Sequence, residues 1–164
     1  MALVNRGVTY GEQGNVELQL ADYTAAVEMS DAPAEQRAMA LVNRGITYGE
    51  QGNVELELAD YTAAVEMPEV PADGYARALG NRAVLMWRQQ NYELCVNDFS
   101  ALLSLDGIEE SLRTQALFAL VEPLVALESR EVVLSTLERA FVEGESEVDG
   151  YGGTPGDLLS LIHI

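Results

Sequence analysis

The side chains that could carry out nucleophilic, acid–base or metal chemistry are few in this sequence. It contains one cysteine, Cys95, and one histidine, His163, so the usual ligands of zinc, haem and iron–sulfur clusters are missing. His163 lies in the terminal segment 159–164, which is interpreted below as non-natural sequence. Without it, no imidazole base remains for a serine or cysteine nucleophile. The sequence therefore predicts no catalytic residue, no metal site and no cofactor, and a protein that is not an enzyme.

The glycine-rich and acidic stretches also lack the spacing that a ligand site needs. The segment GYGGT at 150–154 has no following lysine and no preceding strand pattern, so it predicts a flexible linker rather than a phosphate loop. Glu109 and Glu110 precede a predicted helix, where carboxylates favour the helix dipole. The acidic residues do not follow the spacing of a calcium loop.

One chemically complementary pair of residues does recur, an arginine followed at a constant separation by an aspartate. The planar guanidinium group can bind a carboxylate through two parallel hydrogen bonds. We expect structural ion pairs between the two helices of one repeat unit, or between neighbouring units, in preference to a ligand site. The pairs are Arg6 with Asp22, Arg44 with Asp60, and Arg82 with Asp98.

These pairs recur because the sequence itself repeats. Residues 1–29 and 39–67 are identical except at two positions. The differences are Val8 against Ile46 and Gln19 against Glu57. A third, more divergent copy follows at the same period of 38 residues, which aligns Asn5, Asn43 and Asn81. Periods of this size are typical of stacked supersecondary units that cannot bury their apolar face alone.

Each unit has the pattern of two helices joined by a tight turn. Apolar and small residues recur at helical spacing on both sides of Gly52-Asn53, where glycine favours the end of one helix and asparagine caps the next. Pro33 and Pro71 suit the first turn of the helix that follows. The first stripe is Leu41, Gly45 and Tyr48, and the second is Val54, Leu58, Tyr61 and Val65.

The spacing of Leu41, Gly45, Tyr48, Gly52, Tyr61 and Ala64 resembles the tetratricopeptide repeat, in its bacterial-type tandem form. The resemblance implies an all-α fold, a right-handed α-solenoid of antiparallel helical hairpins. The third copy drifts to Leu79, Ala83, Met86, Gln90, Phe99 and Leu102. Cys95 occupies the family's small-residue site, which predicts a packed core thiol. Gln19 and Glu57 replace a small residue, so we expect looser packing or exposure there.

The repeat array is expected to span residues 1–143, with units at about 1–32, 33–70, 71–107 and 108–143. The fourth unit keeps the period through Leu117, Leu124, Leu137 and Ala140, and Pro123 should kink or end its first helix. Residues 144–158 predict a glycine-rich linker and the start of another helix. The segment LSLIHI at 159–164 matches the translation of a sequencing-adapter end and is interpreted as read-through. Met1 aligns with Met39 and is compatible with an internal position of a longer protein.

In the resembled family, the first helices line a concave groove that binds extended peptides or partner helices. The corresponding residues include Val4, Asn5, Val8, Glu12, Val42, Asn43, Ile46, Glu50, Arg77, Gly80, Asn81, Val84, Trp87 and Arg88. Asn43 matches the asparagine of clamps for terminal carboxylates, but the lysines of those clamps are absent. Trp87 is either a binding anchor or a core filler.

The acidic composition bears on possible partners. The net charge is −18, all nine basic residues are arginine, and nearly half of the residues are apolar. This charge disfavours nucleic acid and anionic lipid, and no apolar run is long enough to span a membrane. We expect a cytoplasmic scaffold that binds a protein or peptide segment, of basic and apolar character. The alternatives are a structural array that self-associates through exposed repeat ends, and the arm of a larger protein with a separate catalytic domain.

Overall fold

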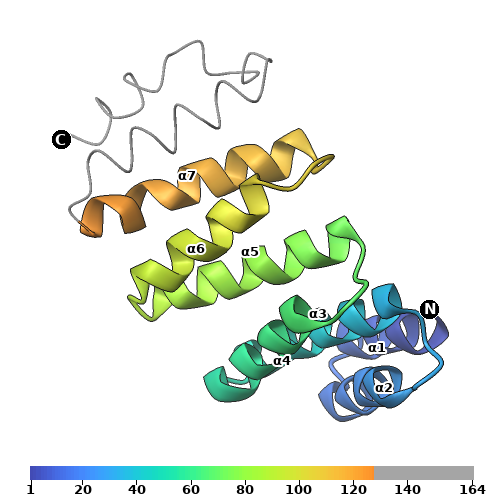
Figure 1. Cartoon of the computed structure of the whole chain (residues 1–164). Coiled ribbons are helices and arrows are strands. Elements are labelled where there is room, and N and C mark those ends of the chain that lie inside the picture. Colours follow the sequence, from blue (N-terminus) through green and yellow to red (C-terminus); the bar gives the residue numbers. More distant parts are fainter. Residues whose placement is uncertain (128–164) are drawn as a thin grey trace.

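The computed structural model describes residues 1–127, which form seven α-helices and no strand (Figure 1). The expected all-α class is confirmed for this part of the chain. The helices are α1 (Ala2–Glu12), α2 (Val16–Glu28), α3 (Ala34–Glu50), α4 (Val54–Glu66), α5 (Ala72–Arg88), α6 (Tyr92–Leu103) and α7 (Glu110–Ala126). Consecutive helices contact one another, and the helices follow one another from α1 and α2 at one end to α7 at the other.

The turns that join the two helices of each pair share the same backbone conformation, which depends on a left-handed residue followed by an asparagine cap. Gly14 and Gly52 adopt φ values of 72° and 74°, in the left-handed region that favours glycine. The asparagine that follows each of these turns accepts a hydrogen bond from the backbone N–H three residues later, as in Leu56 N to Asn53 Oδ1. In the third copy Gln90 takes the same position with φ 58°, at a steric cost that glycine would avoid.

Close contact between the paired helices depends on glycine at one point of each first helix. A Cβ atom on Gly45 would lie 2.7 Å from Cε1 of the buried Tyr61 ring. Gly7 has the same relationship to Tyr23. The repeated glycine and tyrosine therefore form one packing unit, in which the aromatic ring fills the space that a side chain on the first helix would occupy.

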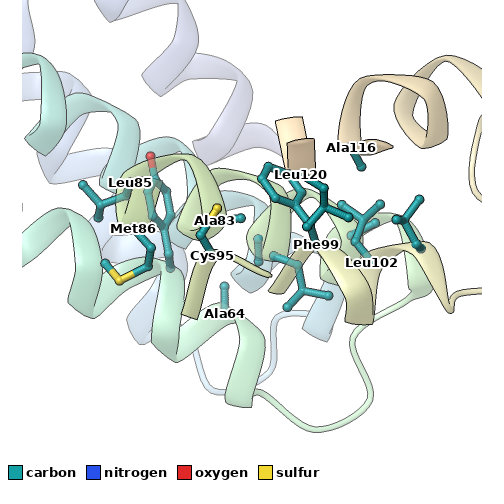
Figure 2. Packing of buried hydrophobic residues seen from close by; sticks show 14 of the residues in the cluster. Ala64, Ala83, Leu85, Met86, Cys95, Phe99, Leu102, Ala116 and Leu120 are labelled. Atoms are coloured by element: carbon teal, nitrogen blue, oxygen red, sulfur yellow. The ribbon is translucent and has the colours of Figure 1, made fainter. Parts of the chain in front are cut away.

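First helices also contact each other across the pairs, α1 with α3, α3 with α5 and α5 with α7. Their small residues, such as Ala38, Ala78 and Ala83, are fully buried. Figure 2 shows side chains of α5, α6 and α7, among them Met86, Cys95 and Leu120, gathered in the largest buried cluster. This cluster is continuous from α3 to α7, and a second, smaller cluster of Val4, Tyr23, Ala26 and Ala40 joins α1 and α2 to α3.

Helix α7 differs from expectation at Pro123. The helix continues through this proline and ends at Ala126, with Pro123 buried. Pro123 has no N–H to donate to the carbonyl four residues earlier, so the helix loses one hydrogen bond there, and burial of the proline ring favours the helical position. The predicted residues Leu137 and Ala140, the linker at 144–158 and the segment 159–164 lie outside the described residues.

Candidate functional site

The three recurring arginines each bind their aspartate in the same way. In the first pair, Arg6 Nε lies 2.6 Å from Asp22 Oδ2 and Nη2 lies 2.7 Å from Oδ1. The other two pairs have Nε–Oδ2 distances of 2.8 Å and Nη2–Oδ1 distances of 2.7 Å. Each pair joins the first and second helices of one unit, and the pairs are Arg44–Asp60 and Arg82–Asp98 in the second and third units.

Two of these arginines also reach the preceding unit. Arg44 Nη1 donates to Thr24 Oγ1 of α2 at 3.0 Å, and Arg82 Nη1 donates to Thr62 Oγ1 of α4 at 3.5 Å. The guanidinium group therefore connects three helices, two of its own unit and one of the unit before. This arrangement uses its donors for structure, which leaves the arginine–aspartate pairs little capacity for a ligand.

The ion pairs shift the ionisation of their members in the expected directions. Hydrogen bonding to Asp60 raises the pKa of Arg44, and hydrogen bonding to Asp98 raises that of Arg82. The hydrogen bond from Arg6 lowers the pKa of Asp22, although burial acts in the opposite direction. The shifts of Arg44, Arg82 and Asp22 favour their charged forms and lead away from the pKa values that acid–base catalysis needs.

A row of exposed apolar side chains runs across the first helices. Val8, Ile46 and Val84 occupy the same register in α1, α3 and α5 and are 42%, 37% and 43% exposed. Because these helices contact their neighbours in turn, the three side chains lie in a row at one register across three units. Trp87, one turn beyond Val84, extends the row and is 40% exposed, so it does not fill a gap in the core.

The row ends beside a cleft of about 260 Å³ between α5, α6 and α7. The cleft floor is apolar, and its rim carries the Arg77 side chain and the Asn81 amide. Asn81 Nδ2 donates to the backbone carbonyl of Arg77 at 2.8 Å, which fixes the orientation of the amide. The lining residues from α5 are Ala76, Arg77, Gly80, Asn81 and Val84, and those from α6 and α7 are Phe99, Leu102, Leu112, Gln115, Ala116 and Ala119.

Two residues expected in the groove are buried instead. Val42 and Val4 are each 2% exposed, and Val42 belongs to the same buried cluster as Leu79 of α5. The physical reason is the direct contact of α1 with α3 and of α3 with α5, which covers this position of α1 and α3. Burial therefore leaves little of the Val42 side chain accessible to a ligand. Asn43, the supposed clamp residue, is partly exposed, and Asn5, Glu12 and Glu50 are exposed.

Arg88 was also expected in the groove, but its guanidinium group binds α4. Arg88 Nη2 donates to Glu57 Oε1 at 2.8 Å. Glu57 is 2% exposed, so the expectation of loose packing or exposure at this residue is wrong. The carboxylate fits because Gly49 has no side chain there, since a Cβ atom at Gly49 would lie 2.6 Å from Glu57 Cδ. Gln19 is partly exposed and lies over Gly11 in the same manner.

A second set of exposed apolar residues was not singled out from the sequence. These are leucines in the first turns of the second helices, 42% to 47% exposed. The sequence could have indicated them, because a leucine recurs at this position in all three units, outside the apolar stripe expected to face the core. They are Leu18, Leu56 and Leu94.

Cys95 is fully buried in α6, and burial raises the pKa of its thiol to about 11. A protonated, inaccessible thiol is a poor nucleophile and a poor metal ligand. Among residues 1–127, no group of three or more histidine, cysteine, aspartate or glutamate residues could hold a metal ion. Within the same residues, no helix has the length and apolar character required to cross a membrane.

No protein-family model matches the chain, and no curated protein gives a significant match to it.

Proposed function

We propose that the chain is a tetratricopeptide-like array, a right-handed α-solenoid of helical hairpins, and that it binds a peptide or protein segment along its first helices without catalysing a reaction. One observation carries this proposal. Val8, Ile46 and Val84 repeat at one register on contacting helices and stay exposed although the chain has an extensive buried core. Exposed apolar side chains that recur at one register of neighbouring helices favour an interaction surface over scattered surface residues.

The cleft beside the row suits the anchoring side chain of such a segment. Its volume of about 260 Å³ and its apolar floor would accept a branched or aromatic side chain. Asn81 and Arg77 at the rim can bind backbone carbonyl groups of an extended ligand, since both carry N–H donors. The net charge of −18, with Glu12 and Glu50 exposed on the first helices, favours a ligand that is basic as well as apolar.

Trp87 provides a direct way to test this proposal, since it is the only tryptophan in the chain. Peptides would be selected from a random display library against the full chain, and binding would be measured through Trp87 fluorescence. We expect the selected peptides to shift the emission of Trp87. Trp87→Ala, measured by calorimetry, should weaken binding at least tenfold, as truncation of a tryptophan anchor usually does.

Two matched serine variants locate the site. Ile46→Ser removes an apolar side chain from the row, and Leu56→Ser removes one of similar exposure, 42% against 37%, from α4. Ile46→Ser should weaken binding by about three- to tenfold, and Leu56→Ser should leave it unchanged. Equal losses in both variants, or a loss confined to Leu56→Ser, would contradict binding along the first helices.

A self-associating array is the second candidate, and the surface of α1 and α2 favours it. A cleft of about 190 Å³ opens there, and most of its lining is apolar, including Leu3, Ala26 and the 43% exposed Met29. Sedimentation velocity over a wide concentration range tests this candidate. A mass that rises with concentration, and no longer rises in Met29→Glu, supports self-association. A constant monomer mass excludes it.

A further inference from the structure

The two nearly identical copies differ in charge at a single position, which holds Gln19 in the first copy and Glu57 in the second. The other difference, Val8 against Ile46, keeps an apolar side chain. Glu57 is 2% exposed, and a buried carboxylate is costly unless it has a partner. Glu57 therefore needs a partner of opposite charge, whereas the neutral Gln19 of the first copy does not.

The partner of Glu57 comes from the next unit. Arg88, the last residue of α5, donates from Nη2 to Glu57 Oε1 at 2.8 Å, across 31 residues of sequence. Tyr61 of α4 adds a long hydrogen bond of 3.4 Å from its hydroxyl to the same oxygen. Arg88 thus supplies the compensating charge, and it lies at the contact between α4 and α5.

The residues equivalent to this pair have different chemistry at the other two junctions. One unit earlier, Gln19 of α2 corresponds to Glu57, and Glu50, the last residue of α3, corresponds to Arg88. One unit later, Cys95 of α6 and Ala126, the last residue of α7, hold these positions. The first junction therefore combines a neutral amide with an acid, and the second combines an acid with a base. The third combines a thiol with a methyl group. By equivalence with Glu57 and Arg88, a glutamate at position 19 would lie opposite the carboxylate of Glu50.

We propose that this pair of positions is a recognition code between units, which selects the helix that packs after each hairpin. Apart from Gln19 and Glu57, helices α2 and α4 are identical in sequence, so apolar packing alone cannot tell one from the other. Glu57 selects α5, which ends in Arg88, and rejects a helix that ends in glutamate. Gln19 accepts α3, which ends in Glu50. The code keeps near-identical units in order, both within one chain and against exchange between two chains.

Variants of the full chain at the first junction test the code. Gln19→Glu places a second carboxylate opposite Glu50 and should lower the thermal midpoint, followed by circular dichroism, by about 2–4 °C. Adding Glu50→Arg to this variant recreates the Glu57–Arg88 pair and should restore the midpoint. At the second junction, Arg88→Glu should lower the midpoint and Glu57→Arg with Arg88→Glu should recover most of the loss.

Glu12→Arg is the matched control for net charge. Glu12 is the last residue of α1 and holds the position of Glu50 and Arg88, but no described hairpin precedes it. Glu12→Arg added to Gln19→Glu changes the net charge as Glu50→Arg does and should not restore the midpoint. Equal rescue by both arginines, a Gln19→Glu chain as stable as the unmodified one, or a Gln19→Glu, Glu50→Arg chain that stays unfolded would each overturn the code.

Size-exclusion chromatography with light scattering gives a second readout, which an ordinary ion pair would not affect. Arg88→Glu removes the feature that directs α5 to α4, so we expect a fraction of dimer formed by exchange of units after refolding at high concentration. The Glu57→Arg, Arg88→Glu chain should refold as the unmodified chain does. Dimer fractions that are the same in all variants would contradict selection of neighbours by this pair.

Discussion

Arg44 and Asp60 form a two-point ion pair, with Nε–Oδ2 at 2.8 Å and Nη2–Oδ1 at 2.7 Å, that joins the two helices of the second unit. The side chains are 16% and 8% exposed, so the pair is largely shielded from water. Arg44 also donates to Thr24 of the preceding unit. The equivalent Arg6 in the first unit is 57% exposed. The same two residue types therefore have different surroundings in different units.

The ion pair predicts a difference between two alanine variants. Arg44→Ala leaves the carboxylate of Asp60 buried without its partner, and should lower the free energy of unfolding by about 2 kcal/mol. Arg6→Ala should cause a smaller loss, since solvent already screens that guanidinium group. Urea unfolding measures both variants, and a double-mutant cycle with Asp60→Ala measures the coupling of Arg44 with Asp60. A coupling energy of zero would contradict the pairing.

Glycine at the helix contacts predicts a second pair of variants. Gly45→Ala places a methyl group 2.7 Å from the buried Tyr61 ring, and we expect a loss of about 1–3 kcal/mol of stability. Gly80→Ala is the control, because its Cβ atom would lie 3.5 Å from Leu102 Cδ1, an ordinary contact. Gly80→Ala should be neutral or stabilising, since alanine favours helix. Equal destabilisation in the two variants, measured by urea unfolding, would contradict the close contact at Gly45.

The left-handed turn residue of the third unit predicts a stabilising substitution. Gln90 has φ 58°, where Gly14 and Gly52 of the other units have φ 72° and 74°. Gln90→Gly should raise the free energy of unfolding by about 1 kcal/mol, because glycine adopts this conformation without steric cost. The reverse change, Gly52→Gln, should lower it by a similar amount. An unchanged urea midpoint in both variants would show that the turn carries no strain.

The buried thiol predicts a loss of stability at alkaline pH. Burial raises the pKa of Cys95 from 9.0 to about 11, so the folded chain keeps its proton where the unfolded chain has lost it. The free energy of unfolding therefore keeps its full contribution from the buried thiol below pH 9, and this contribution is lost as the pH rises from 9 to 11. Cys95→Ala should reduce the fall in urea midpoint over this range. The native thiol should also react with a disulfide reagent only as fast as the chain opens. Rapid labelling at pH 8 would contradict burial.

Some of the site followed from the sequence because it depends on spacing alone. A residue that recurs with the repeat keeps the same spacing from its partner within the unit, so Arg44 could be matched with Asp60 before their distance was known. The exposed row at Val8, Ile46 and Val84 follows the same rule. By contrast, Val42 was assigned to the groove from the resemblance to the tetratricopeptide repeat, and its burial depends on how closely the next first helix packs.

The sequence by itself determined that the chain forms helices in pairs, where the pairs turn and which residues recur together. These features depend on local forces, namely the helical period of apolar residues, the left-handed glycine and the asparagine cap. The tertiary structure decided which repeated residues are exposed and which distant residues become partners. Glu57 is buried because α5 packs on α4 and brings Arg88 to its carboxylate, and the free energy of that contact arises between units rather than within one.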